Sequence, residues 1–505
     1  MAGAGQYNVR MALPTAIYST RQVRDLDQHA ICEQGVPGYT LMKRAGEASL
    51  RIMRTRWPMA HHIAIVCGSG NNAGDGYVLA RFAQAAGLDV RVLAVADPQG
   101  LRGDARRAWQ DFVASAGEVE PWGGGAAGLV SGDVVVDALL GTGLEGPVRP
   151  AFAAAIAAIN ACGRPVFALD IPSGLSGDTG LPLGAAVRAD CTITFVGLKT
   201  GLYLGDGPEY CGTIFFDDLE VTAPERDSLR PRLQRILESE IGTALPRRPR
   251  AAHKGSFGRV LVIGSGPGMP GATRLAGEAA LRVGAGLVTV LAAPECALAV
   301  AGGRPELIVH ALEDPQAIDE HLARADVIAI GPGLGRCNWA QRVFARVIDT
   351  PKPLIVDADA LNLLAAQACT ARGNWVLTPH PGEAARLLGV DTAAIQSDRL
   401  GALDALVGRY GGIVVLKGAG TLVGGTGRVA AICERGNPGM AAPGMGDVLT
   451  GAIAGIAAQV GDTWTATRVG VLVHAMAGDA EARNGERGLL ASEVAQEIRT
   501  WVNLQ

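Results

Sequence analysis

Short apolar runs alternate with Ala-rich or amphipathic stretches through the first half of the chain. The runs are HIAIVCG, DVRVLAVA, DVVVDALLG, PVFALDIPSG and CTITFVG, and the stretches between them include YVLARFAQAAG and AFAAAIAAIN. Runs of this kind are typical of parallel strands that helices cover on both faces of a sheet. Upstream, Ser19 and Gln22 predict a capping box for a helix that carries Val23, Leu26 and Ala30. The pattern predicts an α/β domain.

The alternation stops between residues 221 and 252 and then resumes. The interrupting segment, APERDSLRPRLQRILESEIGTALPRRPRAA, is rich in Arg and Pro. A basic partner-binding segment would explain this composition, but we favour a solvated linker. Further strand-like runs follow (GRVLVIGSG, GLVTVLAAP, DVIAIGPG, PLIVDADA, NWVLTPH and GIVVLKGAG), and the closing helices include GDVLTGAIAGIAAQV and TRVGVLVHAMAGDAEARNG. We therefore predict two α/β domains that join near residue 230.

Composition and charge restrict the class of protein. A chain of 505 residues, 48% hydrophobic and 19% charged, is too long for one core and fits folded α/β domains. The net charge of −4 provides no general attraction for nucleic acid or an anionic membrane, and no apolar run is long enough to span a bilayer. The first residues do not resemble a signal peptide, and nine cysteines without a C-x-x-C pair suit reduced thiols. We expect a cytoplasmic homo-oligomer that binds small molecules, and neither nucleic acid nor membrane.

Lysine is rare in this chain. Only Lys43, Lys199, Lys254, Lys352 and Lys417 occur among 45 Lys and Arg residues. Because a guanidinium fork does not replace a compact ammonium, a chain that uses Arg elsewhere can keep Lys for a specific function. Three of the lysines lie in or beside Gly-containing turns, GLKTGL, HKGSFG and LKGAGT. These lysines are candidates for a site, although chance explains any one of them.

Polar residues gather where the predicted strands of the first half end. The loop CGSGNNAGDG satisfies G-x-G-x-x-A, which alone is a weak dinucleotide signal, but Asn71, Asn72 and Asp75 add oxygens that a simple chain reversal does not need. Asp137 and Asp170 each end an apolar run, and the carboxyl ends of parallel strands share one edge of a sheet. Oxygen ligands of this kind suit a hard cation. The alternative, that these side chains only cap helices and turns, stays open.

Three motifs then carry a family resemblance. CGSGNNAGDG, DALLGTGLEG and LDIPSGLSGDTG, in this order, resemble the NAD(P)H-hydrate epimerase domain. The resemblance implies a Rossmann-like three-layer domain over residues 1–225, a bound K⁺ and a hydrated nicotinamide cofactor as substrate. The implied substrate contacts are Asn71, Asn72, Ala73, Gly74, Asp75, Gly141, Thr142, Gly143, Leu144, Glu145, Gly146, Pro147 and Asp170.

The same resemblance implies roles for individual side chains. Asn72, Asp137 and Ser173 would hold K⁺, and Asp170 would be the acid–base group. A carboxylate suits this reaction because loss of configuration at a hydroxyl-bearing ring carbon requires proton transfer in both directions. Lys199, at the end of another predicted strand, is our hypothesis for a cationic helper. One departure is Ala73-Gly74, where the family often has two glycines.

The second half contains another G-x-G-x-x-G, in GSGPGMPG, but no clear ribose-binding acid follows it, so ordinary Rossmann binding of NAD is disfavoured. Several polar residues again follow predicted strands; they are Asp357, Asp359, Asn362, His380, Glu383 and Lys417. The stretch GMAAPGMGDVLTG, residues 439–451, places a Gly-rich turn before a helix without any P-loop motif. The N–H groups of residues 444–446 could bind phosphate there, and Asp447 could act as a general base. A plain N-cap aspartate is the alternative.

A longer set of motifs carries a second resemblance. HKGSFGRVLVIGSGPGMPGA, DADALNLL, TPHPGEA, LKGAGT and GNPGMAAPGMGDVLTG resemble the ADP-dependent NAD(P)H-hydrate dehydratase domain, a relative of ribokinases, over residues 240–505. The resemblance implies a ribokinase-like α/β domain with ADP contacts from Lys417, Gly418, Ala419, Gly420, Thr421 and Gly446. It implies hydrate contacts from Ala272, Gly335, His380 and Asp447, with Asp447 catalytic. His380-Pro-Gly-Glu383 stands where related kinases carry N-x-x-E, and Glu383 could organise Mg²⁺ through water.

The two resemblances together predict a bifunctional enzyme of metabolite repair. Residues 1–225 would interconvert the R and S hydrates of NADH and NADPH, residues 226–239 would be a linker, and residues 240–505 would dehydrate the S form with ADP. One alternative is an ATP-dependent small-molecule hydroxymethyl kinase with an accessory Rossmann-like module. The other alternative makes the first half a non-catalytic binding or sensor module.

Overall fold

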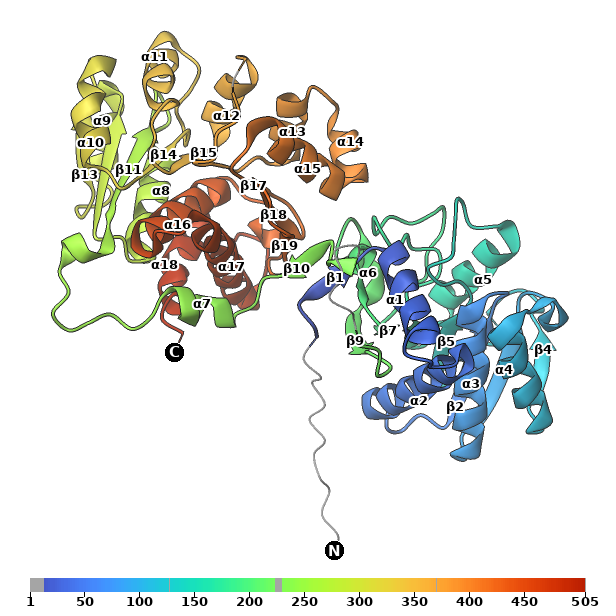
Figure 1. Ribbon diagram of the computed structural model, residues 1–505. Coiled ribbons are helices and arrows are strands. Elements are labelled where there is room, and N and C mark those ends of the chain that lie inside the picture. The colour runs from blue at the N-terminus through green and yellow to red at the C-terminus, as the bar shows by residue number, and fades with distance from the viewer. Residues whose placement is uncertain (1–12, 127, 223–228, 369, 505) are drawn as a thin grey trace, which may run out of the picture. The chain divides into compact units, whose positions relative to one another are not determined.

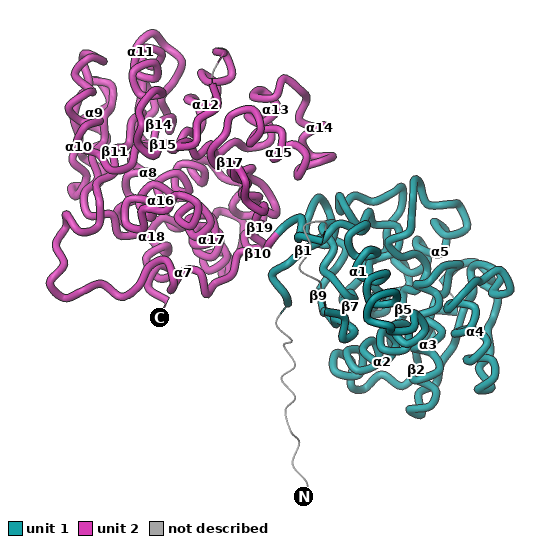
Figure 2. The backbone as a smooth tube through the Cα atoms, viewed as in Figure 1, with its two compact units in different colours: residues 1–233 teal, residues 234–505 magenta. Residues whose placement is uncertain are grey.

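The computed structural model describes residues 13–126, 128–222, 229–368 and 370–504. The chain forms two compact units, Met1–Leu233 and Gln234–Gln505 (Figures 1 and 2). Residues 226–228 of the predicted linker lie outside the described residues, as do residues 1–12, which carry most of the segment judged not to be a signal peptide.

Unit 1 contains a seven-stranded parallel sheet in the order β4-β3-β2-β5-β6-β7-β9. Its strands are β2 (His62–Cys67), β3 (Asp89–Ala94), β4 (Val119–Pro121), β5 (Val134–Ala138), β6 (Val166–Leu169), β7 (Cys191–Phe195) and β9 (Thr213–Asp217). Two further strands, β1 (Ala16–Tyr18) and β8 (Leu198–Lys199), pair in parallel. The β-strands predicted in the first half are all present.

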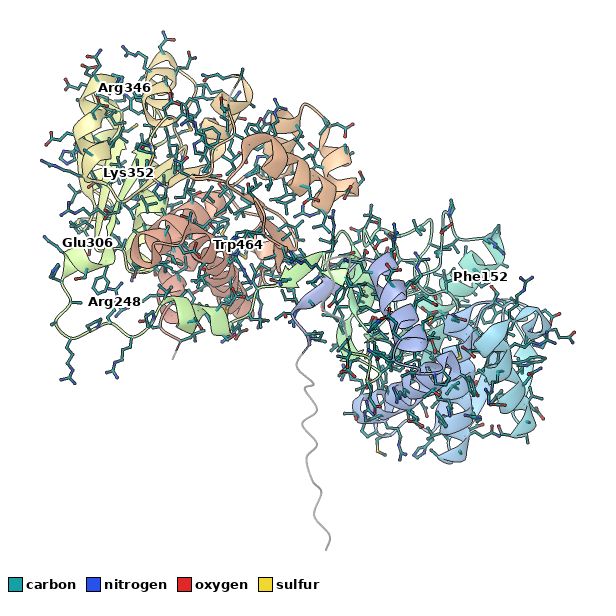
Figure 3. The ribbon with its side chains drawn as sticks, viewed as in Figure 1. Phe152, Arg248, Glu306, Arg346, Lys352 and Trp464 are labelled. Atoms are coloured by element: carbon teal, nitrogen blue, oxygen red, sulfur yellow. The ribbon has the colours of Figure 1, made fainter. Side chains whose placement is uncertain are left out.

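Helices cover both faces of this sheet. They are α1 (Thr20–Cys32), α2 (Gly38–Arg56), α3 (Asn71–Ala85), α4 (Gly103–Ala114), α5 (Pro150–Ala161) and α6 (Gly207–Cys211). On β2, Ile63 and Ile65 pack in one core with α2, α3 and α4, whereas Ala64 and Val66 pack in a second core with α5. Phe152 of α5 belongs to this second core (Figure 3). Burial on both faces explains why these strands are apolar runs rather than alternating ones.

The strands of unit 2 run in the order β13-β12-β11-β14-β15-β16-β17-β18-β19, parallel up to β17 and antiparallel from there. Their bounds are β10 (Leu233–Arg235), β11 (Arg259–Gly264), β12 (Leu287–Ala292), β13 (Ile308–Ala311), β14 (Val327–Ile330), β15 (Leu354–Val356), β16 (Trp375–Leu377), β17 (Ile413–Leu416), β18 (Thr421–Gly425) and β19 (Ala430–Cys433). The Gly-rich hairpin predicted after Lys417 is the β17–β18 turn.

Four helices of unit 2, α8, α16, α17 and α18, pack together and share a core with the sheet (Figure 1). The bounds of all unit 2 helices are α7 (Ser239–Ala244), α8 (Pro270–Arg282), α9 (Pro294–Ala301), α10 (Ile318–Arg324), α11 (Asn338–Val347), α12 (Ala358–Ala365), α13 (Pro381–Leu388), α14 (Thr392–Ser397), α15 (Arg399–Tyr410), α16 (Met445–Val460), α17 (Thr463–Glu481) and α18 (Ala491–Trp501). The mixed α/β class and the parallel sheets predicted from the sequence are confirmed.

Both sheets reverse their strand order at one point, and ligands of open α/β sheets bind at such points. In unit 1 the reversal lies between β2 and β5, and in unit 2 it lies between β11 and β14. Glycine lets the two loops approach each other there. A Cβ atom on Gly68 would lie 1.8 Å from the carbonyl oxygen of Leu139, and one on Gly266 would lie 2.3 Å from that of Leu334. The topology therefore places a crevice at the same edge as the polar strand ends.

The predictions about membrane-spanning segments and about cysteine thiols can be compared with the structure. Among the described residues, no helix is long and apolar enough to cross a bilayer. The eight cysteines within the described ranges are all free thiols, six of them buried. Cys369 lies outside the described residues.

Candidate active sites

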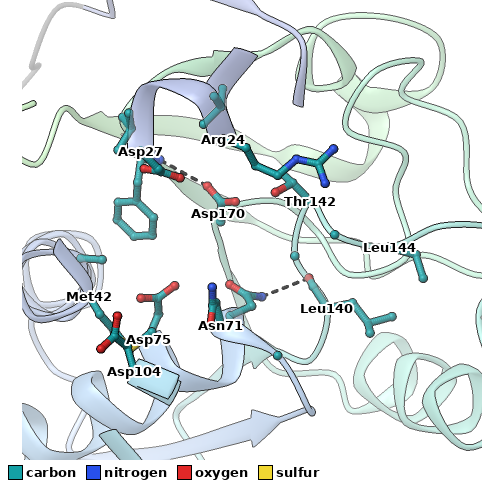
Figure 4. A pocket seen from close by; sticks show the side chains of 18 of the residues that line it. Arg24, Asp27, Met42, Asn71, Asp75, Asp104, Leu140, Thr142, Leu144 and Asp170 are labelled. Carbon is teal, nitrogen blue, oxygen red and sulfur yellow. Dashed lines mark hydrogen bonds between the residues drawn. The ribbon is translucent and has the colours of Figure 1, made fainter. Parts of the chain in front are cut away.

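A cavity of about 790 Å³ opens at the carboxyl edge of the unit 1 sheet (Figure 4). Its wall brings together most of the predicted substrate residues: Asn71, Asn72, Asp75, residues 141–145, Pro147 and Asp170, with Lys199 beside them. Ala73, Gly74 and Gly146 lie off this wall. Ala73 is buried in the core, and a Cβ on Gly74 would clash with Met42. Their substrate contacts stay predictions.

Lys199 and Asp170 form an ion pair at the centre of this wall. The ammonium of Lys199 is almost fully buried and donates to Asp170, to Thr194 Oγ1 at 2.8 Å and to the carbonyl oxygen of Phe195 at 2.9 Å. Three acceptors satisfy the three N–H bonds of the ammonium. The side chain of Asp170 is 18% exposed and can therefore reach a ligand in the cavity.

The backbone of Asp170 is held in an unusual conformation. Its φ is +65°, in the left-handed region that residues with a Cβ rarely adopt, and its N–H donates to the carbonyl oxygen of Ile193 at 2.7 Å. Val196, at the end of the neighbouring strand, also has a positive φ of 64°. Such conformations persist only where the surrounding structure imposes them, and they cluster at functional sites.

Two further carboxyl groups of this wall, those of Asp75 and Asp27, interact with the charges of this pair. Burial raises the pKa of Asp75 well above its usual value, and the charge of Asp170 raises it further. Burial raises the pKa of Asp27 to about 6, with Lys199 lowering it and Asp170 raising it. Asp27 was not predicted as a site residue from the sequence. Its position between Val23 and Ala30, on the predicted apolar stripe of α1, is the one signal that could have indicated it.

A group of buried oxygens lies next to the cavity. Asp137, fully buried, accepts from Ser173 Oγ at 2.6 Å and from Ser173 N at 2.7 Å, and Ser173 Oγ also lies 3.0 Å from the carbonyl oxygen of Leu140. Asn72 donates to that carbonyl at 3.0 Å, while its own Oδ1 is buried without a hydrogen-bond partner among the described residues. Burial raises the pKa of Asp137 to about 6. An unpaired amide oxygen beside a buried carboxyl group fits a cation that prefers oxygen ligands.

The centre of the unit 2 site is a second buried lysine–aspartate pair. Lys417 Nζ donates to Asp357 Oδ1 at 2.8 Å and lies 3.8 Å from Glu383 Oε2. Asp357 also accepts from Thr378 Oγ1 and Thr450 Oγ1, each at 2.8 Å. Burial alone would lower the pKa of Lys417, but the charges of Asp357 and Glu383 raise it above its usual value. The ammonium therefore stays charged.

The Gly-rich turn before α16 ends beside the Lys417–Asp357 pair. Gly444 adopts the left-handed conformation, with φ +89°, and is the N-cap of α16. The first N–H groups of a helix have no acceptor within the helix. A Cβ on Gly446 would lie 3.2 Å from Lys417 Nζ, so glycine leaves this point open. Burial raises the pKa of Asp447, in the first turn of α16, to about 7, Asp357 raises it further and Lys417 opposes the rise. At neutral pH this carboxyl group can both give and accept a proton.

Arg399 supports the predicted nucleotide loop, residues 417–421, through hydrogen bonds to its backbone. This side chain, 6% exposed, donates to the carbonyl oxygens of Leu416 at 3.2 Å, Lys417 at 3.3 Å and Gly420 at 3.3 Å. Thr421 Oγ1 donates to the carbonyl oxygen of Gly418 at 2.9 Å. Neither the sequence pattern nor the resemblance singled out Arg399.

His380 and Glu383 form a reciprocal cap at the start of α13. His380 Nδ1 accepts from Gly382 N at 3.0 Å, and Glu383 Oε2 accepts from His380 N at 2.8 Å. Because Nδ1 is an acceptor, a neutral ring carries its proton on Nε2. Burial lowers the pKa of His380, and nearby Lys417 lowers it further. A neutral imidazole can therefore offer an N–H to a ligand.

The remaining predicted residues of unit 2 lie at its switch point. A Cβ on Gly333 would lie 3.0 Å from that of Ala272, which places Ala272 against the loop that contains Gly335. Asp359 accepts from Gly335 N at 2.9 Å and also raises the pKa of Asp447. The structure thus connects Ala272 and Gly335 to the acidic side chains around Asp447.

The rare lysines divide by role. Lys199 and Lys417 each form an ion pair with an aspartate at a predicted site, Asp170 and Asp357 respectively. Lys352 donates to the carbonyl oxygens of Ala323 and Ala325 and so caps the C-terminal end of α10 (Figure 3). Lys43 lies over the ring of Tyr39, 5.8 Å from its centroid. Among the described residues, none forms a hydrogen bond or ion pair with the ammonium of Lys254.

Comparison with known families gives two matches. Residues 38–201 match the family described as the YjeF-related protein N-terminus, and residues 260–500 match the family described as NAD(P)H-hydrate dehydratase. The bifunctional NAD(P)H-hydrate repair enzyme of Coxiella burnetii is 44% identical over 97% of this chain and 100% of its own length. The enzyme of the same name from Escherichia coli is 42% identical over 98% of this chain and 95% of its own length.

Among solved structures, unit 2 resembles an ADP/ATP-dependent NAD(P)H-hydrate dehydratase from Bacillus subtilis, crystallised with ATP and Mg²⁺. That structure is 29% identical, with a TM-score of 0.50, and covers 53% of this chain and 96% of its own chain. A ribokinase-like protein from Enterococcus faecalis matches at 28% identity and a TM-score of 0.50, covering 56% of this chain and 98% of its own. The expected ribokinase-like fold of the second half is therefore confirmed.

Proposed function

The chain belongs to the family of bifunctional NAD(P)H-hydrate repair enzymes, and we propose that its two units divide the reaction between them. Unit 1 interconverts the R and S hydrates of NADH and NADPH, and unit 2 dehydrates the S hydrate with ADP. We propose the functional limits 1–225 and 240–505, with residues 226–239 as the connection. The observation that carries this division is the repeated arrangement: each unit sets a lysine–aspartate ion pair with one buried partner, Lys199 or Asp357, at the strand edge, inside its own set of predicted ligand residues.

In unit 1, Asp170 is the acid–base residue and Lys199 holds it in place. The hydroxyl of the hydrate lies on a ring carbon next to nitrogen, so the nitrogen lone pair can expel it once a proton is supplied. Lys199 fixes one oxygen of Asp170 and leaves the other for the substrate. Asn71, Asp75 and residues 141–147 surround the substrate.

We assign the buried oxygens of Asn72, Asp137 and Ser173 to K⁺. The unpaired Oδ1 of Asn72 supports this assignment, because a cation would satisfy it. Bound K⁺ supplies a fixed positive charge that keeps Asp137 ionised. Through Leu140, whose carbonyl oxygen accepts from Asn72, the ion would also fix the start of the loop over the substrate.

In unit 2, ADP lies along residues 417–421 with a phosphate at Gly446, and the hydrate contacts Ala272, Gly335, His380 and Asp447. Asp447 takes the proton of the substrate hydroxyl as that oxygen attacks the terminal phosphate of ADP. AMP leaves, and the new phosphate ester is a good leaving group. The ring nitrogen then expels phosphate, and the neighbouring ring carbon loses a proton, which restores the dihydropyridine. The fixed N–H groups at the start of α16 stabilise the charge on the moving phosphoryl group.

Mg²⁺ would accompany the nucleotide in this site. Glu383 is buried beside Lys417 and suits an indirect contact through water, as magnesium retains several waters in nucleotide sites. The free thiols of the described residues suit a cytoplasmic location. We also propose that the chain forms a homo-oligomer.

One assay tests both activities. A mixture of R and S hydrates is incubated with ADP or with ATP, and the absorbance of NADH is followed. Complete recovery requires both sites, whereas recovery that stops at the S fraction would mean that unit 1 is a silent binding module. A stable phosphate ester formed from ATP without recovery of NADH would instead identify a hydroxymethyl kinase.

A further inference from the structure

Asp27 lines the unit 1 cavity on a helix that is firmly anchored. α1 begins at a capping box between Ser19 and Gln22, and Thr20 donates through both its N–H and its hydroxyl to Asp178, at 2.7 and 2.8 Å. Val23, on the same face, is buried. The anchoring fixes the side of α1 that carries Asp27 toward the cavity (Figure 4).

The carboxyl group of Asp27 is available to a ligand. Within the described parts of the chain, no group donates a hydrogen bond to it, in contrast to Asp137 and Asp357, whose carboxylates are occupied by protein donors. The other charged side chains on the wall of this cavity are Arg24, Asp75, Asp104, Glu145, Arg149, Asp170 and Lys199. One ammonium thus serves three nearby carboxyl groups, those of Asp27, Asp75 and Asp170.

These three carboxyl groups have different surroundings. Asp170 receives the hydrogen bond of Lys199. Burial raises the pKa of Asp75 well above its usual value, and the charge of Asp170 raises it further. Burial raises the pKa of Asp27 to about 6, so this carboxyl group changes charge near neutral pH. Efficient proton transfer requires a group whose pKa lies close to the working pH.

The chemistry requires more than one acid–base group. To invert the carbon, the hydroxyl must leave one face of the ring and water must return to the other. A single carboxylate cannot serve both faces without rearrangement, whereas two carboxyl groups with different proton affinities can act in turn.

We propose that Asp27 is a second catalytic acid–base residue of the epimerase site and works with Asp170 as a pair. This inference rests on the function proposed for unit 1. Protonated Asp27 gives its proton to the hydroxyl, the ring nitrogen lone pair expels water and the C–O bond breaks, leaving an iminium ion. Water then forms a new C–O bond on the opposite face and loses a proton to Asp170. The proton returns to Asp27 through the solvent of the cavity, so no other reactant is consumed.

The test compares Asp27→Asn with Asp25→Asn, which removes an exposed carboxylate from the same helix. Conversion of the R to the S hydrate is measured without ADP, and dehydration of pure S hydrate by the same preparations reports that the chain is folded. For Asp27→Asn we expect kcat of epimerisation to fall by about a hundredfold or more, with little change in KM and normal dehydration. Asp25→Asn should match the wild type.

A pH profile and a conservative variant separate catalysis from structure. The wild-type rate should fall as the pH rises through about 6, where Asp27 loses its proton, and this limb should vanish in Asp27→Asn. Asp27→Glu should recover a substantial part of the rate. Epimerisation by Asp27→Asn within twofold of wild type, or Asp27→Glu as slow as Asp27→Asn, would overturn the inference. A wild-type chain that dehydrates but does not epimerise would instead overturn the function proposed for unit 1.

Discussion

Lys199 and Asp170 are 29 residues apart in the sequence, and yet the lysine ammonium, whose side chain is only 1% exposed, donates directly to that carboxylate. The pair joins Asp170, directly after β6, to Lys199 at the end of β8, and both residues line the unit 1 cavity. An ammonium so deeply buried contributes nothing to solubility. Its position beside Asp170 explains why this chain, which otherwise uses arginine, has a lysine here.

Removing this ammonium should disable epimerisation alone. In Lys199→Met, Asp170 loses its hydrogen-bonded positive partner, so its carboxylate is no longer fixed in place. We expect epimerisation to slow by about a hundredfold or more. Lys43→Met, outside the cavity wall, is the matched control, and dehydration of S hydrate should be normal in both variants. Unchanged epimerisation in Lys199→Met would remove this residue from the site.

Asp447→Asn should abolish dehydration while epimerisation continues. The variant keeps the shape of the side chain but cannot take the proton of the substrate hydroxyl. Because the pKa of Asp447 is raised to about 7, the wild-type dehydration rate should increase as the pH rises through 7 and then level off, as the carboxylate form accumulates. Steady-state rates from pH 5.5 to 8.5 test both statements, and a variant with near wild-type turnover would refute the assignment.

K⁺ should stabilise the protein through the group formed by Asn72, Asp137 and Ser173. In K⁺-free buffer the raised pKa of Asp137 means that the folded state binds its proton more tightly than the unfolded chain does. Its contribution to stability is therefore full below about pH 4 and is lost as the pH rises through about 6, by an amount on the order of 3 kcal/mol.

Thermal unfolding at pH 8 measures this effect. Wild-type Tm should rise when K⁺ replaces a large organic cation, because a ligand that binds only the folded state stabilises it. Asn72→Leu removes the unpaired oxygen and should lose most of that increase, while Asn160→Leu, which changes an amide outside this oxygen group, should retain it. An equal increase in all three proteins would argue against a K⁺ site at these residues.

Arg399→Met should weaken nucleotide binding, although Arg399 is not one of the predicted ADP contacts. The change leaves the carbonyl oxygens of Leu416, Lys417 and Gly420 without their common donor, which frees the loop and lowers stability by about 2 to 4 kcal/mol. We expect KM for ADP to rise about tenfold, with a smaller effect on kcat. Arg409→Met, on the exposed side of the same helix, is the control.

The sequence was most informative where physical constraints are local. Parallel strands buried on both faces must be apolar throughout, so β2, β5, β11 and β14 could be recognised directly. Short strands such as β1, β8 and β13 were not predicted, because their existence depends on distant partners. Polar residues at strand ends, such as Asp137 and Asp170, were identifiable because topology brings strand ends together.

Contacts across the fold were much harder to predict. Arg399 lies on a helix far along the chain from the catalytic motifs, and only the folded structure shows that it supports the 417–421 loop. Thr378 and Thr450 are ordinary residues in the sequence, although both hold Asp357. Asp27 gave only a weak signal in the sequence, a carboxylate on the apolar stripe of α1. Because an ordinary amphipathic helix is compatible with that carboxylate, the sequence did not indicate a function for it.

The helix that presents Asp447 is packed by α8 on one side and α17 on another, and most of its residues from Val448 to Ala457 are buried. A turn fixed to such a helix is rigid before any nucleotide arrives. Binding therefore needs to order little of the protein, and the loss of entropy on association falls mainly on the ligand. The phosphate site that we propose at this turn should therefore discriminate by shape, accepting a diphosphate or triphosphate tail while rejecting anions that would have to reshape it.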